Sequence, residues 1–364
     1  MKYIDEYRKS NLLKKLAEKI RVISKKLDRE VNIMEVCGTH TMAIGKYGIR
    51  KVMSDNINLI SGPGCPVCVC PDTYIDKAIE ISKQKDVIIT TFGDMIRVPG
   101  SYSSLEKEKS KGADIKVVYS SIEALKIAEE NKNKKVVFLA VGFETTSPSI
   151  AMTVKLAVRK KIENFFILSG HKLIPPAMKF LLKDSEVKID GFLAPGHVST
   201  IIGVYPYNFI PEKYRIPVVI SGFEPFDILK SIYLVIESIV SGNPSVINQY
   251  KRVVKENGNE KAREVLYDVF EKGNSEWRGI GEIENSGLKL KKEYTFFDAE
   301  KKFKIKIRKT KKRTGCICGE VLKGTKKPTD CKLFANICNP ENPVGPCMVS
   351  SEGTCAAYYK YERK

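Results

Sequence analysis

Short apolar runs rich in β-branched residues alternate with helical patterns along much of the chain, and this alternation limits the fold more than any other feature. The runs lie at 31–36, 57–61, 86–92, 115–120, 135–141, 164–169, 190–194 and 216–223. Helical patterns lie at 1–29, 73–84, 121–131 and 147–160. Strands and helices in alternation favour parallel sheets that helices cover on both faces. The sequence therefore predicts an α/β fold with doubly wound sheets.

Length and composition divide the chain into three predicted domains. The chain has 364 residues, and single hydrophobic cores stop growing beyond roughly 250–300 residues. We predict a first α/β domain over 1–115, with the N-terminal helix and a cleft lined by cysteines, and a second α/β domain over 116–225. The pattern then turns helical at 226–240, 244–257 and 260–272. Six of the ten cysteines lie beyond these helices, so a third domain is expected over 226–364.

The formal charge of +19 raises the question of an anionic partner. A basic surface can bind nucleic acid, an anionic membrane or an acidic protein. The densest basic run, at 301–313, alternates lysines with Phe303, Ile305 and Ile307, which is typical of a half-buried edge strand whose charged face is solvated. No aromatic-interleaved or Gly-rich RNA-binding pattern accompanies it. We therefore expect no nucleic-acid partner, with RNA binding or an acidic protein partner as the alternatives.

The hydropathy of the chain indicates the compartment. No uninterrupted apolar stretch approaches the ~18 residues of a membrane span, and the first residues lack the apolar core of a secretory signal. We therefore expect a cytoplasmic protein with no membrane partner. Disulfides are disfavoured in that compartment, so clustered cysteines there indicate metal ligands or redox-active thiols.

The loops that follow the predicted strands carry the reactive side chains. They read "CGTHT" (37–41), "GPGCPVCVC" (62–70), "TFGDMIRVPGS" (91–101), "GFETTSP" (142–148), "SGHKLIPP" (169–176) and "APGHVSTIIG" (194–203). In open α/β sheets, ligands bind at the carboxyl ends of the strands, where such loops gather. All three histidines, His40, His171 and His197, lie in these loops. They are candidate site residues, although each one taken singly could be a hydrogen-bonded structural histidine.

Cys65 and Cys68 form a C-x-x-C pair on a loop that prolines stiffen. Such a pair can bind one metal ion or form a mutual disulfide. Cys37 and His40 offer a further thiol and an imidazole. One interpretation is a zinc site, but no second C-x-x-C lies at zinc-finger spacing. The other interpretation is a thioredoxin-like redox pair. Cys70 adds a thiol without an evident partner, and we give it no role.

The C-terminal cysteines stand at 316, 318, 331, 338, 347 and 355, a spacing that fits no zinc-finger template. Six thiols are two more than one tetrahedral metal or one [4Fe–4S] cluster uses. A division into four ligands and one spare pair is therefore natural. In its cysteine arrangement, though not in its fold, this division resembles ferredoxin:thioredoxin reductase, in which a cluster lies against a redox-active disulfide.

Taken together, the motifs resemble those of the HypD family of [NiFe]-hydrogenase maturation factors. The matching stretches are "MEVCGTHTMAI", "GPGCPVCVCP", "GFETTSP", "SGHKLIPPAM", "DGFLAPGHVSTIIG" and "CMVSSEGTCAAYYKY", which run from residue 34 to residue 361. The resemblance implies an assembly scaffold with redox chemistry rather than a conventional turnover enzyme. It also implies a small partner, HypC, that helps to hold the iron of an Fe(CN)2CO group, and HypE as the cyanide donor, with HypF upstream.

Residue roles follow from the same resemblance. Cys37, His40, Cys65 and Cys68 would line the cleft in which iron receives its ligands. From residue chemistry alone, donors to bound cyanide or other cofactor contacts are expected among the loop residues Thr145, Thr146, His171, His197 and Ser199. A [4Fe–4S] cluster would take Cys316, Cys331, Cys338 and Cys355, which leaves Cys318 and Cys347 as a redox pair. Because a C-x-C lets either sulfur reach a metal, Cys316 and Cys318 could exchange roles.

Two other functions remain open from the sequence. One is a [4Fe–4S]-dependent thiol–disulfide reductase that acts on a protein substrate and has no scaffold role. The other is an RNA-binding protein with a structural metal, which only the charge favours. Cyanide and carbonyl infrared bands in a complex with a HypC-like protein are expected of the scaffold alone.

Overall fold

Strands from two distant parts of the chain form the first of two parallel sheets. The computed structural model describes residues 5–8, 10–307 and 315–363. The first sheet has the order β2-β1-β7-β8-β9, and all its neighbouring strands are parallel. Its strands are β1 (Val31–Glu35), β2 (Ile57–Ser61), β7 (Gly191–Pro195), β8 (Val218–Ser221) and β9 (Val246–Asn248).

Helices cover both faces of the first sheet. One face packs on α1 (Ser10–Ser24), α2 (Gly38–Lys46) and α10 (Pro225–Val240). The other faces α7 (Ile174–Leu181), α8 (Gly196–Ile202) and α9 (Phe209–Tyr214). Successive residues of β1 alternate between the two cores, with Ile33 in the first and Met34 in the second. Burial on both faces explains why these strands read as continuous apolar runs.

The second sheet is built from the chain between β2 and β7. Its order is β4-β3-β5-β6, again with parallel neighbours. Its strands are β3 (Val87–Thr91), β4 (Ile115–Val117), β5 (Lys135–Ala140) and β6 (Phe165–Ser169). α5 (Ser121–Glu130) and α6 (Ser147–Lys160) cover one face, and α3 (Asp72–Ser82) and α4 (Leu105–Ser110) cover the other. The prediction of an α/β fold with doubly wound parallel sheets is therefore confirmed.

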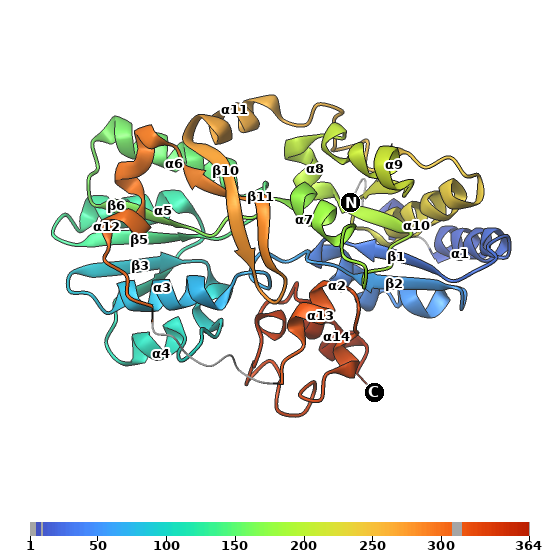
Figure 1. The fold of residues 1–364 in the computed structure, drawn as a ribbon, viewed down its shortest axis with the longest axis horizontal. Coiled ribbons are helices and arrows are strands. Elements are labelled where there is room, and N and C mark those ends of the chain that lie inside the picture. Colours follow the sequence, from blue (N-terminus) through green and yellow to red (C-terminus); the bar gives the residue numbers. More distant parts are fainter. Residues whose placement is uncertain (1–4, 9, 308–314, 364) are drawn as a thin grey trace.

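The rest of the chain connects the two sheets. Figure 1 shows the sheets side by side, with an antiparallel hairpin between them and the cysteine-rich tail beneath the hairpin. The hairpin consists of β10 (Phe270–Trp277) and β11 (Gly281–Leu290), and α11 (Glu260–Val269) leads into it. The tail contains α13 (Cys318–Leu322) and α14 (Thr354–Tyr361), and α14 packs on α2. Short helical segments complete the chain: η1 (Asp5–Arg8), η2 (Ile49–Val52), η3 (Gly93–Arg97), η4 (Tyr205–Tyr207), η5 (Lys292–Phe297), α12 (Ala299–Lys302), η6 (Pro328–Asp330) and η7 (Pro346–Met348).

Two predicted elements are wrong. The helix expected over 244–257 is replaced by β9 and a loop, in which the buried Asn248 side chain donates a hydrogen bond to the Val254 carbonyl at 2.9 Å. The β-branched pair Val246 and Ile247 adds to the sheet instead of entering a helix. The edge strand expected over 301–313 is also absent from its described part, since α12 extends to Lys302 and residues 304–307 form no regular element. Its remainder, 308–313, lies outside the described residues.

The sheets do not follow the predicted domain limits. β4 begins at Ile115 and pairs with β3, so the limit at 115 falls inside the second sheet. α10 begins at Pro225 and packs on β8 of the first sheet, so the limit at 225 does not separate it from that sheet. We propose that the units follow the sheets, with the second sheet inserted into the first and the tail as a third unit. Within the described ranges, no helix is both long and apolar enough to cross a membrane.

The tip of the hairpin joins the C-x-x-C loop to the tail. The Arg278 backbone N–H donates to the Val69 carbonyl at 2.9 Å. The next residue, Gly279, has φ +69° and packs directly on the tail, where an added Cβ would lie 2.4 Å from the Cα atom of Gly319. Only glycine combines this left-handed backbone with so close an approach. The sequence Arg278–Gly279 therefore fixes where the tail meets the loop.

We expect Gly279→Ala to loosen this joint. The left-handed backbone costs an alanine roughly 1–2 kcal/mol, and the clash with Gly319 adds about 1–3 kcal/mol. Gly242→Ala is the matched control, since Gly242 has φ +66° and nothing within 4 Å of its added Cβ. Urea unfolding should show a larger loss of stability for Gly279→Ala, and limited proteolysis should cut its tail faster. Equal effects of the two changes would contradict the proposed contact.

Candidate functional site

The C-x-x-C loop lies where the chain passes from the first sheet to the second. The loop leaves β2 with the Gly62 N–H donating to the Glu35 carbonyl at 2.7 Å. Cys65 and Cys68 are both buried, and the Cys68 backbone N–H points to the Cys65 sulfur at 3.3 Å. Burial raises the pKa of the Cys68 thiol well above its ordinary value. The structure has both as free thiols.

Cys37 occupies the switch point of the first sheet, where the strand order reverses between β1 and β7. It precedes α2, and the backbone N–H groups of Thr39 and His40 point toward its sulfur. Burial nevertheless raises the pKa of the Cys37 thiol to about 12, and the charge of Glu352 adds to this rise. The thiol is therefore protonated at neutral pH, and binding a metal there requires the loss of its proton.

His40 and His197 both stack on one aromatic side chain. The rings of both lie against Phe223, with centroid distances of 4.9 Å for His40 and 4.0 Å for His197. The structure thus brings together the loops after β1, β7 and β8. Phe223 was not among the predicted site residues, because its role depends on two rings that are distant in sequence.

His40 is a neutral imidazole. Its Nε2 atom lies 3.0 Å from the Gly222 carbonyl, which can only accept, so Nε2 carries the hydrogen. Nδ1 then has a free lone pair, and it has no hydrogen-bond partner in the described structure. Burial lowers the pKa of His40 to about 4. His40 therefore does not supply the positive charge beside Cys37 that its sequence position suggests, but it can bind a metal or accept a hydrogen bond.

Glu352 is a site residue that the sequence reasoning missed. It comes from the tail, and its carboxylate accepts a hydrogen bond from the Thr39 hydroxyl at 2.7 Å. Its charge also acts on Cys37 and on His197. The one sequence feature that could have indicated Glu352 is its place in "SSEGTC", between two tail cysteines. Through Glu352 the tail places an acid beside the switch-point thiol.

Cys347 joins the tail to the C-x-x-C loop. Its sulfur accepts hydrogen bonds from the thiols of Cys355 and Cys68, and these bonds lower its pKa well below the ordinary value. Cys68 and Cys347 are both buried, and they share an apolar core with Cys65. Arg278 also stabilises a Cys347 thiolate through its charge. The Cys68 and Cys347 thiols, which are far apart in the sequence, therefore meet in the fold.

All six tail cysteines line one small cavity of ≈ 20 Å³. Its other walls are largely apolar, with Ile317, Leu333 and Phe334 among them. Across the residues that the structure describes, no three His, Cys, Asp or Glu side chains are gathered closely enough to hold one metal ion. A [4Fe–4S] cluster binds one cysteine at each iron, so its four sulfurs need not converge on a point. The thiols that line the cavity are sufficient in number and kind for the four cysteine ligands of such a cluster.

The remaining predicted residues are spread over several environments. Thr145 is exposed and Thr146 is half-buried at the start of α6. The Ser199 hydroxyl is buried and is engaged with the Pro195 carbonyl at 2.9 Å and the Tyr207 hydroxyl at 3.0 Å. His171 lies in the core beside the second sheet, with its ring against Phe270 and Nδ1 at 3.2 Å from Ser169. Neither Ser199 nor His171 is in contact with a cysteine in the interactions described.

Comparisons with known proteins give one consistent family. A family model described as "HypD: Hydrogenase formation hypA family" matches residues 11–362. The hydrogenase maturation factor HypD2 of Bradyrhizobium diazoefficiens is 46% identical over 100% of this chain and 97% of its own length. The hydrogenase maturation factors HypD of Cupriavidus necator and Escherichia coli are 45% and 44% identical over 100% of this chain, and over 98% and 99% of their own lengths.

The three histidines should titrate separately. Burial lowers the pKa of His40 to about 4 and that of His171 to about 3, and it lowers the pKa of the more accessible His197 less. Because folded-state values lie below the ordinary 6.5, the neutral rings of His40 and His171 favour folding above that pH, and this contribution is lost as the pH falls from 6.5 toward 4. NMR of histidine-labelled protein should show His197 protonating first. A His40 pKa above 6 would contradict a neutral imidazole beside Cys37.

Proposed function

Because the chain belongs to the HypD family of hydrogenase maturation factors, we propose that it acts with a HypC-like protein as a scaffold on which iron receives cyanide and carbonyl ligands. The iron is cargo for a [NiFe] active site. The contact between the Cys68 and Cys347 thiols carries the proposal, since it joins the cleft to the cysteine-rich tail. A HypE-like protein would bring cyanide, with a HypF-like protein upstream. We place this assembly in the cytoplasm.

Cys37, Cys65 and Cys68 are the soft donors that ferrous iron with cyanide and carbonyl ligands prefers. All three are buried, so a metal that binds there leaves water and displaces thiol protons. The negative charge of Glu352 raises the pKa of Cys37, so it favours the protonated thiol until a metal cation takes the place of the proton. The lone pair on Nδ1 of His40 offers a further ligand or a hydrogen-bond acceptor. Thr145, Thr146, His197 and Ser199 stay candidates for contacts to the diatomic ligands, and His171 stays a more remote one.

In the tail, Cys316, Cys331, Cys338 and Cys355 are the proposed ligands of a [4Fe–4S] cluster. Such a cluster, when bound, supplies electrons one at a time to neighbouring sulfurs. The cavity that the six tail cysteines line supports this donor set. Cys318 and Cys347 are the proposed redox pair, and the thiols of Cys316 and Cys318 contact each other, so their roles can exchange.

Thiol–disulfide exchange then transfers electrons from the tail to the cleft. The Cys347 thiolate attacks the Cys68 sulfur of a Cys65–Cys68 disulfide, and Cys65 leaves as a thiolate. The Cys318 thiolate next attacks Cys347, which forms the Cys318–Cys347 disulfide and releases Cys68. Two electrons pass from the tail thiolates to the cleft disulfide, and no atom is transferred between the two sites. The low pKa of Cys347 favours it as the attacking thiolate.

The reductase alternative uses the same thiols but needs access to a protein substrate. Cys68 and Cys347 are 0% and 1% exposed. A protein disulfide has no route to sulfurs so deeply covered, whereas a small ion or a diatomic ligand needs far less space. Burial therefore favours the scaffold over the reductase.

A complex with a HypC-like protein tests the scaffold directly. Purified without oxygen from cells that make the other maturation proteins, it should show cyanide and carbonyl infrared bands. Cys68→Ala should abolish the bands and keep the iron and sulfide of the tail, because the two sites use different cysteines. Cys70→Ala is the matched control, since Cys70 is equally buried but contacts no tail thiol in the interactions described. The proposal would be wrong if the bands remained in Cys68→Ala or were absent from the unchanged complex.

Single alanine variants of the six tail cysteines test the cluster ligands. We expect about four irons per chain in the unchanged protein and a severe loss in Cys331→Ala, because a cluster that lacks one thiolate is labile. Cys318→Ala and Cys347→Ala should keep their iron and lose only the tail disulfide. Iron lost from Cys318→Ala but kept in Cys316→Ala would show that these two cysteines have exchanged roles. Zinc in place of iron throughout would refute the cluster.

A further inference from the structure

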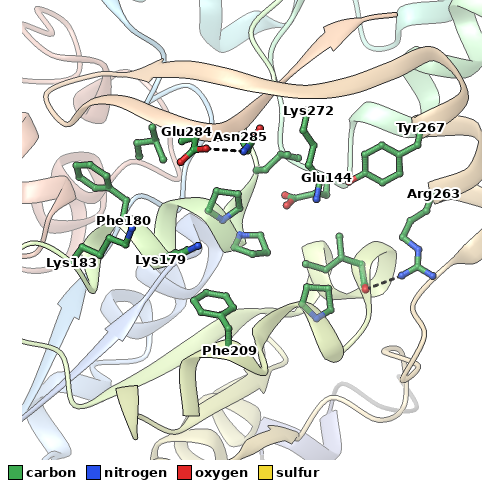
Figure 2. Close-up of a pocket in the computed structure, with 16 residues that line it drawn as sticks. Glu144, Lys179, Phe180, Lys183, Phe209, Arg263, Tyr267, Lys272, Glu284 and Asn285 are labelled. Carbon is green, nitrogen blue, oxygen red and sulfur yellow. Dashed lines mark hydrogen bonds between the residues drawn. The ribbon is translucent and has the colours of Figure 1, made fainter. Parts of the chain in front are cut away.

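A cavity of ≈ 760 Å³ lies apart from the cysteines, between the two sheets and the hairpin (Figure 2). It is walled by residues of α7, α9, α11 and the hairpin strands, and no cysteine or histidine is among the described residues that line it. The volume falls in the range of roughly 300–1,000 Å³ that small-molecule sites occupy. The proposed scaffold chemistry makes no use of this cavity.

Glu144 gives the cavity a polar focus. Its side chain is 2% exposed, and its Oε1 atom accepts a hydrogen bond from the Ile174 N–H at 2.9 Å. Its Oε2 atom is buried and has no hydrogen-bond partner in the described part of the chain. Figure 2 shows Glu144 among the side chains around the cavity, with Lys272 and Tyr267 beside it. Buried acceptors are almost always satisfied, so an open one on a cavity wall points to a ligand that donates to it.

The charges on the wall favour an anion. The cations that line the cavity are Lys179, Lys183, Arg263 and Lys272, and the carboxylates are Glu144 and Glu284. Arg263 is held in place by a hydrogen bond to the Ile202 carbonyl at 3.1 Å. Lys272 acts electrostatically on Glu144, so one lysine faces the carboxylate while the others remain to attract a negative group. Four cations against two carboxylates leave an excess of positive charge.

The rest of the wall is apolar and partly aromatic. Phe180, Phe209 and Tyr267 present their rings to the cavity, and Pro175 and Pro176 form a rigid part of its wall at the start of α7. Aromatic walls with a few placed polar groups are typical of sites for organic ligands. A simple inorganic anion would leave these surfaces without a partner.

We propose that this cavity binds a small organic anion that combines an aromatic or apolar body with an N–H or O–H donor. The donor meets Oε2 of Glu144, the body packs against the aromatic walls, and the anionic group faces the lysines at the rim. Glu144 follows β5 of the second sheet, whereas Phe209 belongs to α9 on the first. A bound ligand therefore touches both units and holds them together.

A set of three related probes tests each part of the proposal on the full chain, purified without oxygen. 2-Anilinonaphthalene-6-sulfonate has all three features: an aromatic body that carries the N–H donor at one end and the anion at the other. N-phenyl-2-naphthylamine lacks the anion, and naphthalene-2-sulfonate lacks the N–H donor together with its phenyl ring. We expect the complete probe to bind in a 1:1 ratio with enhanced fluorescence and to bind roughly tenfold more tightly than either partial probe.

Variants then localise the binding. Glu144→Gln keeps an oxygen for the Ile174 N–H but turns the open acceptor into a donor, so it should weaken the complete probe about tenfold and leave naphthalene-2-sulfonate unchanged. The exposed pair Lys179→Met and Lys183→Met should weaken the two sulfonates and not the uncharged amine. Lys213→Met, an exposed lysine of α9 that does not line the cavity, is the matched control. Equal affinity of all variants for the complete probe would overturn the proposal, as would equal weakening of all three probes by Glu144→Gln.

Discussion

The buried Arg278 guanidinium is the interaction on which the arrangement of the cysteines depends. It forms an ion pair with Asp72 and donates hydrogen bonds to the carbonyl of Pro99 at 2.9 Å and, at 3.5 Å, to that of Cys70. These partners belong to the C-x-x-C loop, the start of α3 and the loop after β3. A buried cation with this many acceptors is costly to move, because each acceptor would lose a charge-assisted bond. The hairpin tip therefore holds the loop rigidly, and the tail docks against a fixed surface.

Desolvation determines the charge of the buried groups in the cleft near Arg278. It raises the pKa of Cys37 and Cys70 to about 12 and that of Glu35 to about 7, and it lowers the pKa of His40. Every one of these shifts favours the neutral form. Two tail cysteines are exceptions: hydrogen bonds from neighbouring thiols lower the pKa of Cys347 and that of Cys316, and the charge of Arg278 acts in the same direction on both. The fold thus keeps the buried cleft largely neutral, and the thiolates that it favours belong to the tail.

The local pattern of the chain predicted β1 to β8 to within a few residues and the loops that carry the three histidines. Burial on both faces of parallel sheets leaves a clear trace in sequence, which is why these elements were visible. The residues that these loops contact in the fold could not be predicted in the same way. Phe223 matters because it lies between two rings from distant loops, and Glu352 because the tail returns to α2. Such contacts depend on strand order, and the insertion of the second sheet into the first has no signature in local periodicity.

Both connections between the sheets carry residues of the proposed site or lie next to one. The outward connection is the C-x-x-C loop, and the return connection contains Lys172 and Leu173, whose backbone N–H groups donate to Gly142 and Ser286. Neither sheet alone positions these segments, since their hydrogen bonds also reach the hairpin and the tail. The geometry of the cysteines is consequently a property of how the units pack together. A substitution at the interface between the sheets should therefore alter the contact between the Cys68 and Cys347 thiols even when no cysteine is replaced.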